Sequence, residues 1–75
     1  MDSIKEIKAT ITEMPLEIKE DLKGRLRAFR SGLISMEDLI LNAENTICWL
    51  RANDHDDEIP FYQHFLDMIK GTNFN

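Results

Sequence analysis

Apolar residues recur along this chain at steps of three and four positions, the spacing that places side chains on one face of an α-helix. In the first run this face carries Ile4, Ile7, Ile11 and Met14. Ser3 and Glu6 have the spacing of a capping box, so the run predicts a helix over residues 3–13. Pro15 lacks an amide hydrogen and disfavours helical geometry at the residue before it. It therefore either opens a second helix or kinks a continuous one.

The second run predicts a helix over residues 15–30 that ends in a tight turn. Its apolar stripe is formed by Ile18, Leu22, Leu26 and Phe29. Gly32 suits the left-handed conformation that terminates helices, and Leu33 is expected to fold back on the last turn. Ser35 and Asp38 form a second capping-box pattern, so residues 31–35 are predicted to join two helices.

Two more helices are predicted in the second half of the chain. The third covers residues 36–52, and its stripe is formed by Met36, Leu39, Ile40, Ala43, Ile47 and Leu50. The fourth covers residues 58–70, with Pro60 in its first turn and Gly71 after its end. Its wide apolar face is formed by Phe61, Tyr62, Phe65, Leu66, Met68 and Ile69. Residues 72–75 are expected to form a frayed tail.

No segment alternates apolar and polar residues in the way a half-buried strand does. The chain is therefore predicted to be all-α, a single domain over residues 1–75 built as a small bundle of three to four helices with short connections. With 43% hydrophobic and 31% charged residues, it has enough apolar side chains for a packed core. No apolar run approaches the roughly 18 to 20 residues of a membrane span, so no membrane association is expected.

The sequence contains no recognisable set of catalytic or metal-ligating residues. Cys48 is the only cysteine, which fits the reducing cytoplasm, and we interpret it as a small packed residue because no base lies near it in sequence. The acidic loop at residues 54–58 lacks the glycine and the distant glutamate of an EF-hand. His55 and His64 lack the spacing of a zinc site. We therefore expect no enzyme activity, no metal and no cofactor.

Charge is distributed unevenly along the chain. Residues 1–31 hold six acidic and seven basic residues, whereas residues 32–75 hold eight acidic and two basic ones. A basic row on the second predicted helix flanks its apolar stripe and is formed by Lys19, Lys23, Arg27 and Arg30. Because the formal net charge is −5, the favoured interpretation is that this row covers the core edge and pairs with the acidic second half. The alternative is that the row contacts the phosphates of a nucleic acid.

The third predicted helix has a second apolar side. Leu41, Cys48 and Trp49 lie roughly 120° to 220° round from its main stripe. The favoured interpretation is that the first or the fourth helix packs against this side. Otherwise these residues form a surface for a protein partner, together with Phe61 or Tyr62 of the fourth helix.

By elimination, the leading hypothesis is a non-enzymatic protein-interaction module, an acidic inhibitor or regulator that forms a hetero-complex or a homodimer. In composition the chain is similar to accessory inhibitors carried by phages and plasmids, including those that present carboxylates in place of phosphates. On that similarity, the partner-binding acidic surface consists of Glu37, Glu44, Asp54, Asp56, Asp57 and Glu58. The alternative hypothesis is a regulator that binds nucleic acid directly through the basic row, which the negative net charge disfavours.

Overall fold

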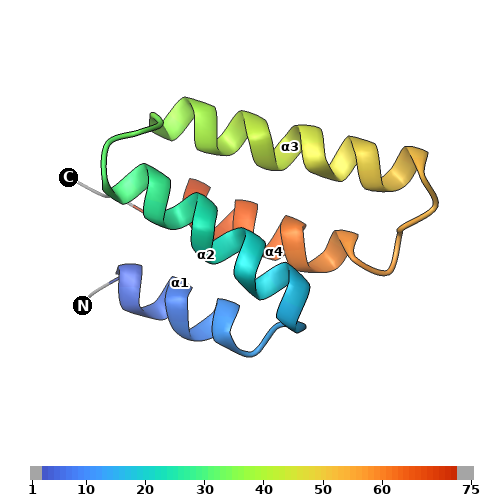
Figure 1. Ribbon diagram of the computed structural model, residues 1–75, viewed down its shortest axis with the longest axis horizontal. Coiled ribbons are helices and arrows are strands. Elements are labelled where there is room, and N and C mark those ends of the chain that lie inside the picture. Colours follow the sequence, from blue (N-terminus) through green and yellow to red (C-terminus); the bar gives the residue numbers. More distant parts are fainter. Residues whose placement is uncertain (1–2, 73–75) are drawn as a thin grey trace.

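The computed structural model describes residues 3–72 and contains four α-helices (Figure 1). They are α1 (Ser3–Thr12), α2 (Leu16–Arg30), α3 (Met36–Ala52) and α4 (Ile59–Lys70). No strand occurs over residues 3–72, so the predicted small all-α bundle with short connections is confirmed. Each predicted helix boundary differs from the observed one by at most one residue. The Ser3 side chain of the first predicted capping box and residues 73–75 of the predicted tail lie outside the described part. The prediction of a frayed tail is wrong for Thr72, whose Oγ1 donates to the Met68 carbonyl oxygen at 2.6 Å.

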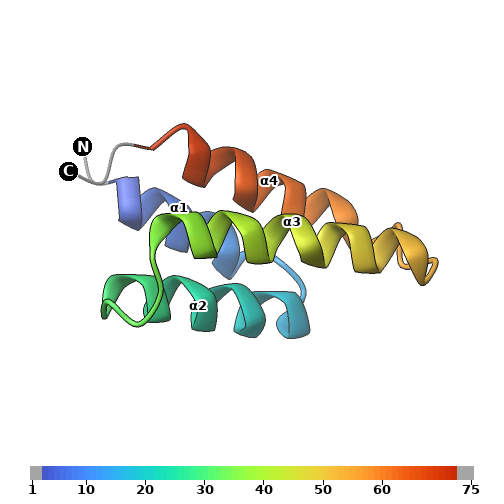
Figure 2. The same cartoon turned by 90° about the horizontal axis from the view of Figure 1, so that it is seen from above.

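The four helices alternate in direction and pack around a common centre. In Figure 1, α3 lies above α2 and α1 lies below it, while Figure 2 shows α2 and α4 on opposite sides of the bundle. The most extensive helix pair is α3 with α4, and α1 contacts both α2 and α4. The bundle is elongated, with extents of 36 × 24 × 19 Å. Each helix therefore buries one face and exposes a long outer face to solvent.

One continuous apolar core fills the centre of the bundle. Its buried side chains are Ile7, Ile11, Met14, Ile18, Leu22, Leu26, Leu39, Ala43, Ile47, Leu50, Tyr62, Phe65, Leu66 and Ile69. All of them belong to the apolar stripes predicted from the sequence, so those stripes are confirmed as the core-facing sides. None of the four helices in the described part combines the length and the apolar character needed to cross a membrane.

Pro15 separates α1 from α2. It is extended, with φ of −53° and ψ of 148°, and it occupies the N-cap position of α2. Just before it, the Met14 N–H donates to the Ile11 carbonyl oxygen at 3.0 Å, which closes α1 with a short turn. Of the two alternatives derived from the sequence, Pro15 opens a new helix.

Gly32 ends α2 in the left-handed conformation, with a φ of 83°. The Gly32 N–H donates to the Phe29 carbonyl oxygen at 3.1 Å, and the Leu33 N–H donates to that of Ala28 at 2.9 Å. These are the two hydrogen bonds of a Schellman motif, so the predicted helix end is confirmed. The expectation that Leu33 folds back on α2 is wrong, because its side chain is 79% exposed and backbone hydrogen bonds close the turn.

Both ends of α3 are fixed by local hydrogen bonds. At its start, Ser35 Oγ accepts from the Asp38 N–H at 3.1 Å and the Ser35 N–H donates to Asp38 Oδ2 at 3.4 Å, which confirms the second capping box. At its end, Asp54 adopts a left-handed φ of 59°, and the His55 N–H donates to the Leu50 carbonyl oxygen at 2.8 Å. The chain thereby leaves α3 in a tight turn and enters the acidic loop before α4.

Gly24 and Gly32 provide a matched pair of substitutions. Gly24 lies inside α2 with nothing within 4 Å of an added Cβ, so Gly24→Ala is expected to raise the free energy of unfolding by about 0.5–1 kcal/mol. Gly32 has the same free space but a positive φ, so Gly32→Ala is expected to lower it by about 1 kcal/mol. Urea denaturation measures both changes. A Gly32→Ala variant as stable as Gly24→Ala would contradict the left-handed turn.

Candidate functional site

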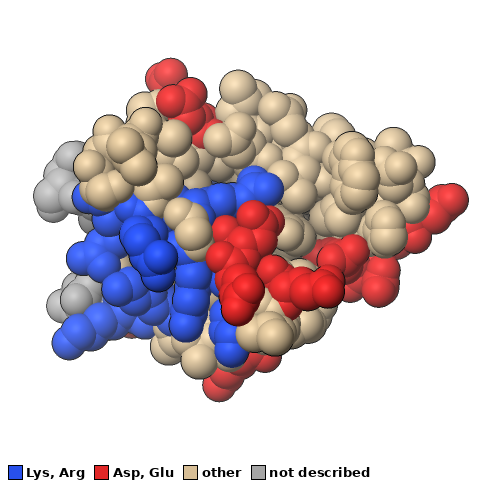
Figure 3. Space-filling view, viewed as in Figure 1, with Lys and Arg blue, Asp and Glu red and all other residues tan. Residues whose placement is uncertain are grey.

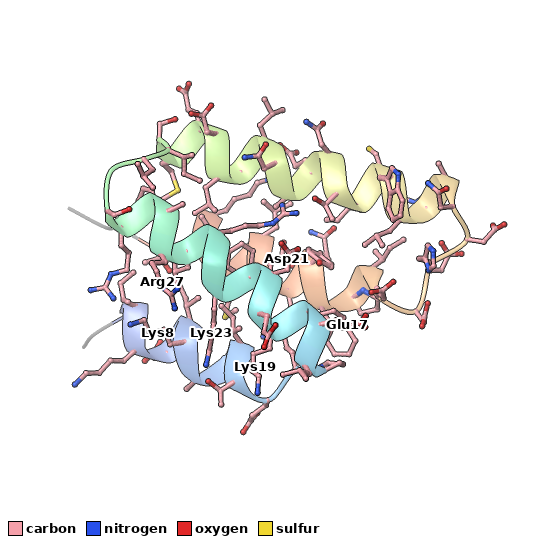
Figure 4. All side chains as sticks on the ribbon, in the orientation of Figure 1. Lys8, Glu17, Lys19, Asp21, Lys23 and Arg27 are labelled. Carbon is pink, nitrogen blue, oxygen red and sulfur yellow. The ribbon has the colours of Figure 1, made fainter. Side chains whose placement is uncertain are left out.

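The basic row of α2 faces α1 across a hollow. This basic hollow has a volume of about 340 Å³ and is lined by Lys8, Thr12, Lys23, Leu26, Arg27 and Arg30. Figure 4 shows Lys8 of α1 and Lys23 of α2 in the strip between the two helices, with Lys19 nearer the start of α2. In Figure 3 the basic side chains form one area over α1 and the C-terminal half of α2, with acidic side chains beside it. Sequence reasoning found the row on α2 but missed Lys8, which only the packing of α1 brings to the hollow.

The predicted pairing between the basic row and the acidic second half is wrong. Over residues 3–72, the ion pairs with carboxylates are Arg25 with Asp21, Lys70 with Glu44, and His55 with Glu58 when the histidine is protonated. None of them includes a side chain of the basic row or Lys8. The reason is geometric, because the row points toward α1 while the acidic residues of the second half lie on α3, in the loop before α4 and, in the case of Asp67, on the exposed side of α4.

The six carboxylates of the predicted acidic surface do not form one row. Glu37 lies in the first turn of α3, and the length of that helix, about 25 Å for its 17 residues, separates it from Asp54. Glu44 lies between them, where its Oε2 is 3.9 Å from Lys70 Nζ. Of the six, Asp54, Asp56, Asp57 and Glu58 lie in one loop, and Asp57 and Glu58 have ligand atoms within 4.8 Å of each other.

The loop also places an imidazole next to its carboxylates. Potential ligand atoms of His55, Asp57 and Glu58 all lie within 4.8 Å of one another. His55 Nδ1 is 3.4 Å from Glu58 Oε2, and its ring stacks on Trp49 with centroids 5.7 Å apart and an interplanar angle of 8°. The His55 and Asp57 side chains are exposed, and Glu58 is half-buried. The group therefore consists of a contact between His55 and Glu58, which is an ion pair when the histidine is protonated, and of the stacking of His55 on Trp49 at the end of α3.

The second apolar side of α3 points into solvent. Leu41 is 55% exposed, Trp49 is 58% exposed, and Cys48 is exposed between them. The expectation that α1 or α4 covers this side is therefore wrong, as is the interpretation of Cys48 as a packed residue. The predicted partner surface also included Phe61 or Tyr62 of α4. Neither extends it, because Tyr62 is buried and Phe61 is half-buried against the core. We call the exposed set of Leu41, Cys48 and Trp49 the outer face of α3.

A second, more open hollow adjoins the outer face of α3. It has a volume of about 450 Å³ and is lined by Arg25, Asn42, Asn45, Thr46 and Trp49. Its amide and hydroxyl groups offer hydrogen bonds beside an exposed indole ring. This combination of an aromatic anchor with a polar rim is common in protein-protein interfaces.

Sequence reasoning missed a polar cluster that joins α2 to α4. Tyr62 Oη donates to Asp21 Oδ2 at 2.6 Å, and Arg25 Nε donates to Asp21 Oδ1 at 3.2 Å. Arg25 Cζ also lies 5.7 Å from the centroid of the Tyr62 ring, within the range of a cation–π contact. The spacing of Asp21 and Arg25 signals an ion pair on one helix, but nothing in the sequence indicates a tyrosine 41 residues from Asp21 as the third member.

Burial raises the pKa of the Tyr62 phenol above its usual value near 10, and the hydrogen bond and negative charge of Asp21 raise it further. The positive charge of Arg25 opposes these effects but is smaller than they are together. The folded protein therefore favours the neutral phenol, which is the form that donates to Asp21. This phenol stays protonated at pH values where the tyrosine of an unfolded chain has already ionised.

No protein-family model matches the chain, and no match is found among curated proteins or solved structures.

The raised pKa of Tyr62 predicts a loss of stability at alkaline pH. Below about pH 10 both the folded and the unfolded chain bind the phenolic proton, whereas above it only the folded chain does. The contribution of this group to the free energy of unfolding is thus complete below that pH and falls by up to about 1.4 kcal/mol per pH unit above it. Tyr62→Phe, which has no phenol, should lack this component. Comparing urea denaturation of the two proteins across this pH range isolates it.

Because Tyr62 is the only tyrosine, tyrosinate absorbance gives an independent reading. We expect it to develop together with the loss of helical circular dichroism, since ionisation requires unfolding. Tyrosinate absorbance that develops near pH 10 in a fully helical protein would contradict the buried hydrogen bond to Asp21.

Proposed function

We propose that this protein is a non-enzymatic interaction module that regulates or inhibits a protein partner by binding it through the outer face of α3. The observation that carries this proposal is the exposure of Trp49 and Leu41, at 58% and 55%, on one side of a helix whose other side is packed in the core. Large apolar side chains grouped on a surface are typical of binding sites. Tryptophan is among the residues that contribute most to binding energy in interfaces.

Trp49 is also held in place before any partner binds. Its ring stacks on His55, and the Asn53 side-chain Nδ2 donates to the Trp49 carbonyl oxygen at 2.8 Å, which secures the last turn of α3. A side chain that is already ordered loses less conformational entropy on binding. Trp49 is therefore the expected anchor, with the amides of Asn42 and Asn45 in the adjoining hollow as its polar rim.

The acidic loop determines the expected charge of the partner. His55 joins the loop to Trp49, so the carboxylates of Asp54, Asp56, Asp57 and Glu58 lie at the same end of α3 as the anchor. A partner that packs on Trp49 with basic residues at its rim fits this arrangement. The geometry does not favour imitation of a whole phosphate row, because Glu37 and Glu44 are separated from the loop along the helix.

The proposal places the protein in the cytoplasm and assigns it no catalytic residue. A single exposed Cys48 suits a reducing compartment, where it neither oxidises readily nor cross-links chains. The partner is a different protein or a second copy of this chain, and in either complex it binds the outer face of α3.

Trp49→Ala tests the anchor. If the outer face of α3 is the binding site, this substitution should weaken binding by about 30-fold or more, which corresponds to about 2 kcal/mol. The measurement is affinity capture from a lysate of the source organism, followed by titration of the captured protein against the wild type and the variant. Sedimentation equilibrium of the wild type alone measures self-association through the same face.

Leu33→Ala is the control, because Leu33 is an even more exposed apolar side chain, in the α2–α3 turn and away from the outer face of α3. It should bind as the wild type does. Equal binding by all three proteins, or a strict monomer that captures no protein, would contradict the proposal.

A further inference from the structure

We propose that the basic hollow between α1 and α2 binds the phosphate backbone of duplex nucleic acid. The contacts come from Lys8 of α1 and from Lys23, Arg27 and Arg30 of α2. This inference goes beyond the proposed function, because the hollow lies on different helices from the outer face of α3. A protein that holds a partner on one face and nucleic acid on another acts as an adaptor between them.

The cations of the hollow are arranged as a row with an opposing wall. Lys23 and Arg27 are one helical turn apart, about 6 Å along α2, and Arg30 extends the row by about 4.5 Å. Lys8 faces this row from α1, with the Thr12 hydroxyl beside it and Leu26 among the lining residues. A single phosphate group would contact only part of such a row, whereas a polymer of phosphates can contact all of it.

The cations of the hollow are not paired with carboxylates within the described part of the protein. No carboxylate of residues 3–72 forms an ion pair with any of the four cations. Four like charges around one hollow repel one another, and a polyanion relieves that repulsion while releasing its own condensed counterions. The overall charge of −5 opposes approach in other orientations, so binding should be restricted to this side and should be sensitive to salt.

The lining also distinguishes a nucleic-acid backbone from other anionic ligands. It contains no aromatic side chain on which an unpaired base would stack, so the contacts are to phosphates and do not depend on base sequence. Its one large apolar member, Leu26, is 1% exposed, so the hollow has no apolar side chain with which to enter a lipid bilayer. Both features favour the outside of a duplex.

Fluorescence anisotropy with a short labelled DNA duplex, measured over a series of KCl concentrations, tests the proposal. Four phosphate contacts predict a slope of log Kobs against log salt of about −3 to −4. Lys23→Gln with Arg27→Gln removes two of the contacts, so the slope should become shallower by about 2 and binding at low salt should fall at least 10-fold. Circular dichroism of the variant confirms that it is folded.

The matched control is Arg51→Gln with Lys70→Gln, which removes the same charge from exposed residues of α3 and α4. It should keep the wild-type slope. Equal losses in both double variants would overturn the proposal, because they would show a dependence on net charge alone. The absence of binding at low salt would also overturn the proposal. Displacement of the duplex by inorganic phosphate at equal phosphate concentration, or tighter binding to phosphatidylserine vesicles than to the duplex, would do the same.

Discussion

Burial of the narrow apolar stripe on α2 determines where every charge on that helix lies. Ile18, Leu22 and Leu26 are buried in the core, and the helical repeat then fixes the direction of the remaining side chains. On one flank, Lys23 and Arg27 turn toward α1 and line the basic hollow. On the other flank, Asp21 and Arg25 turn toward Tyr62 of α4. A rotation of α2 about its axis would dismantle both arrangements at once.

The flank that faces α4 is secured by a polar cluster at the edge of the core. Asp21 accepts hydrogen bonds from Tyr62 and Arg25, so its charge is compensated although the cluster is partly buried. Arg25 Nη1 is buried without a hydrogen-bond partner in the described part of the protein, a cost that the contact with the Tyr62 ring partly offsets. Such directional contacts fix the rotation of α2 more sharply than apolar packing does. The basic hollow on the opposite flank therefore depends on them.

The sequence was sufficient to predict where each helix begins and ends, but it was insufficient to predict which helices contact each other. Local signals at Pro15, Gly32 and Ser35 act within a few residues, and the structure confirms each of them. The stripe periodicity likewise identified the buried residues. Which helix covers which side depends on contacts between distant segments, and there the predictions failed: the outer face of α3 is not covered, and the basic row of α2 is not paired with acidic residues.

The candidate site was accordingly only half predictable. A helical projection identified the row on α2 and the apolar residues Leu41 and Trp49, because both are properties of one helix. It could not place Lys8 opposite the row or Tyr62 beside Asp21, since each of these contacts joins two helices. Tyr62 was predicted as part of the partner surface, but it is buried and does not contribute to that surface. The exposed surface that results has two separate regions, one basic on α1 and α2 and one apolar on α3.

The separation of these two regions is the central claim, and amide chemical-shift mapping tests it most directly. The measurement is a titration of isotopically labelled protein with a short DNA duplex, with the indole of Trp49, the only tryptophan, as an internal reporter of the α3 face. The account predicts shifts concentrated at Lys8, Thr12, Lys23 and Arg27 and an unchanged indole signal. Shifts centred on Trp49 and Asn45, with α1 and α2 unaffected, would contradict it.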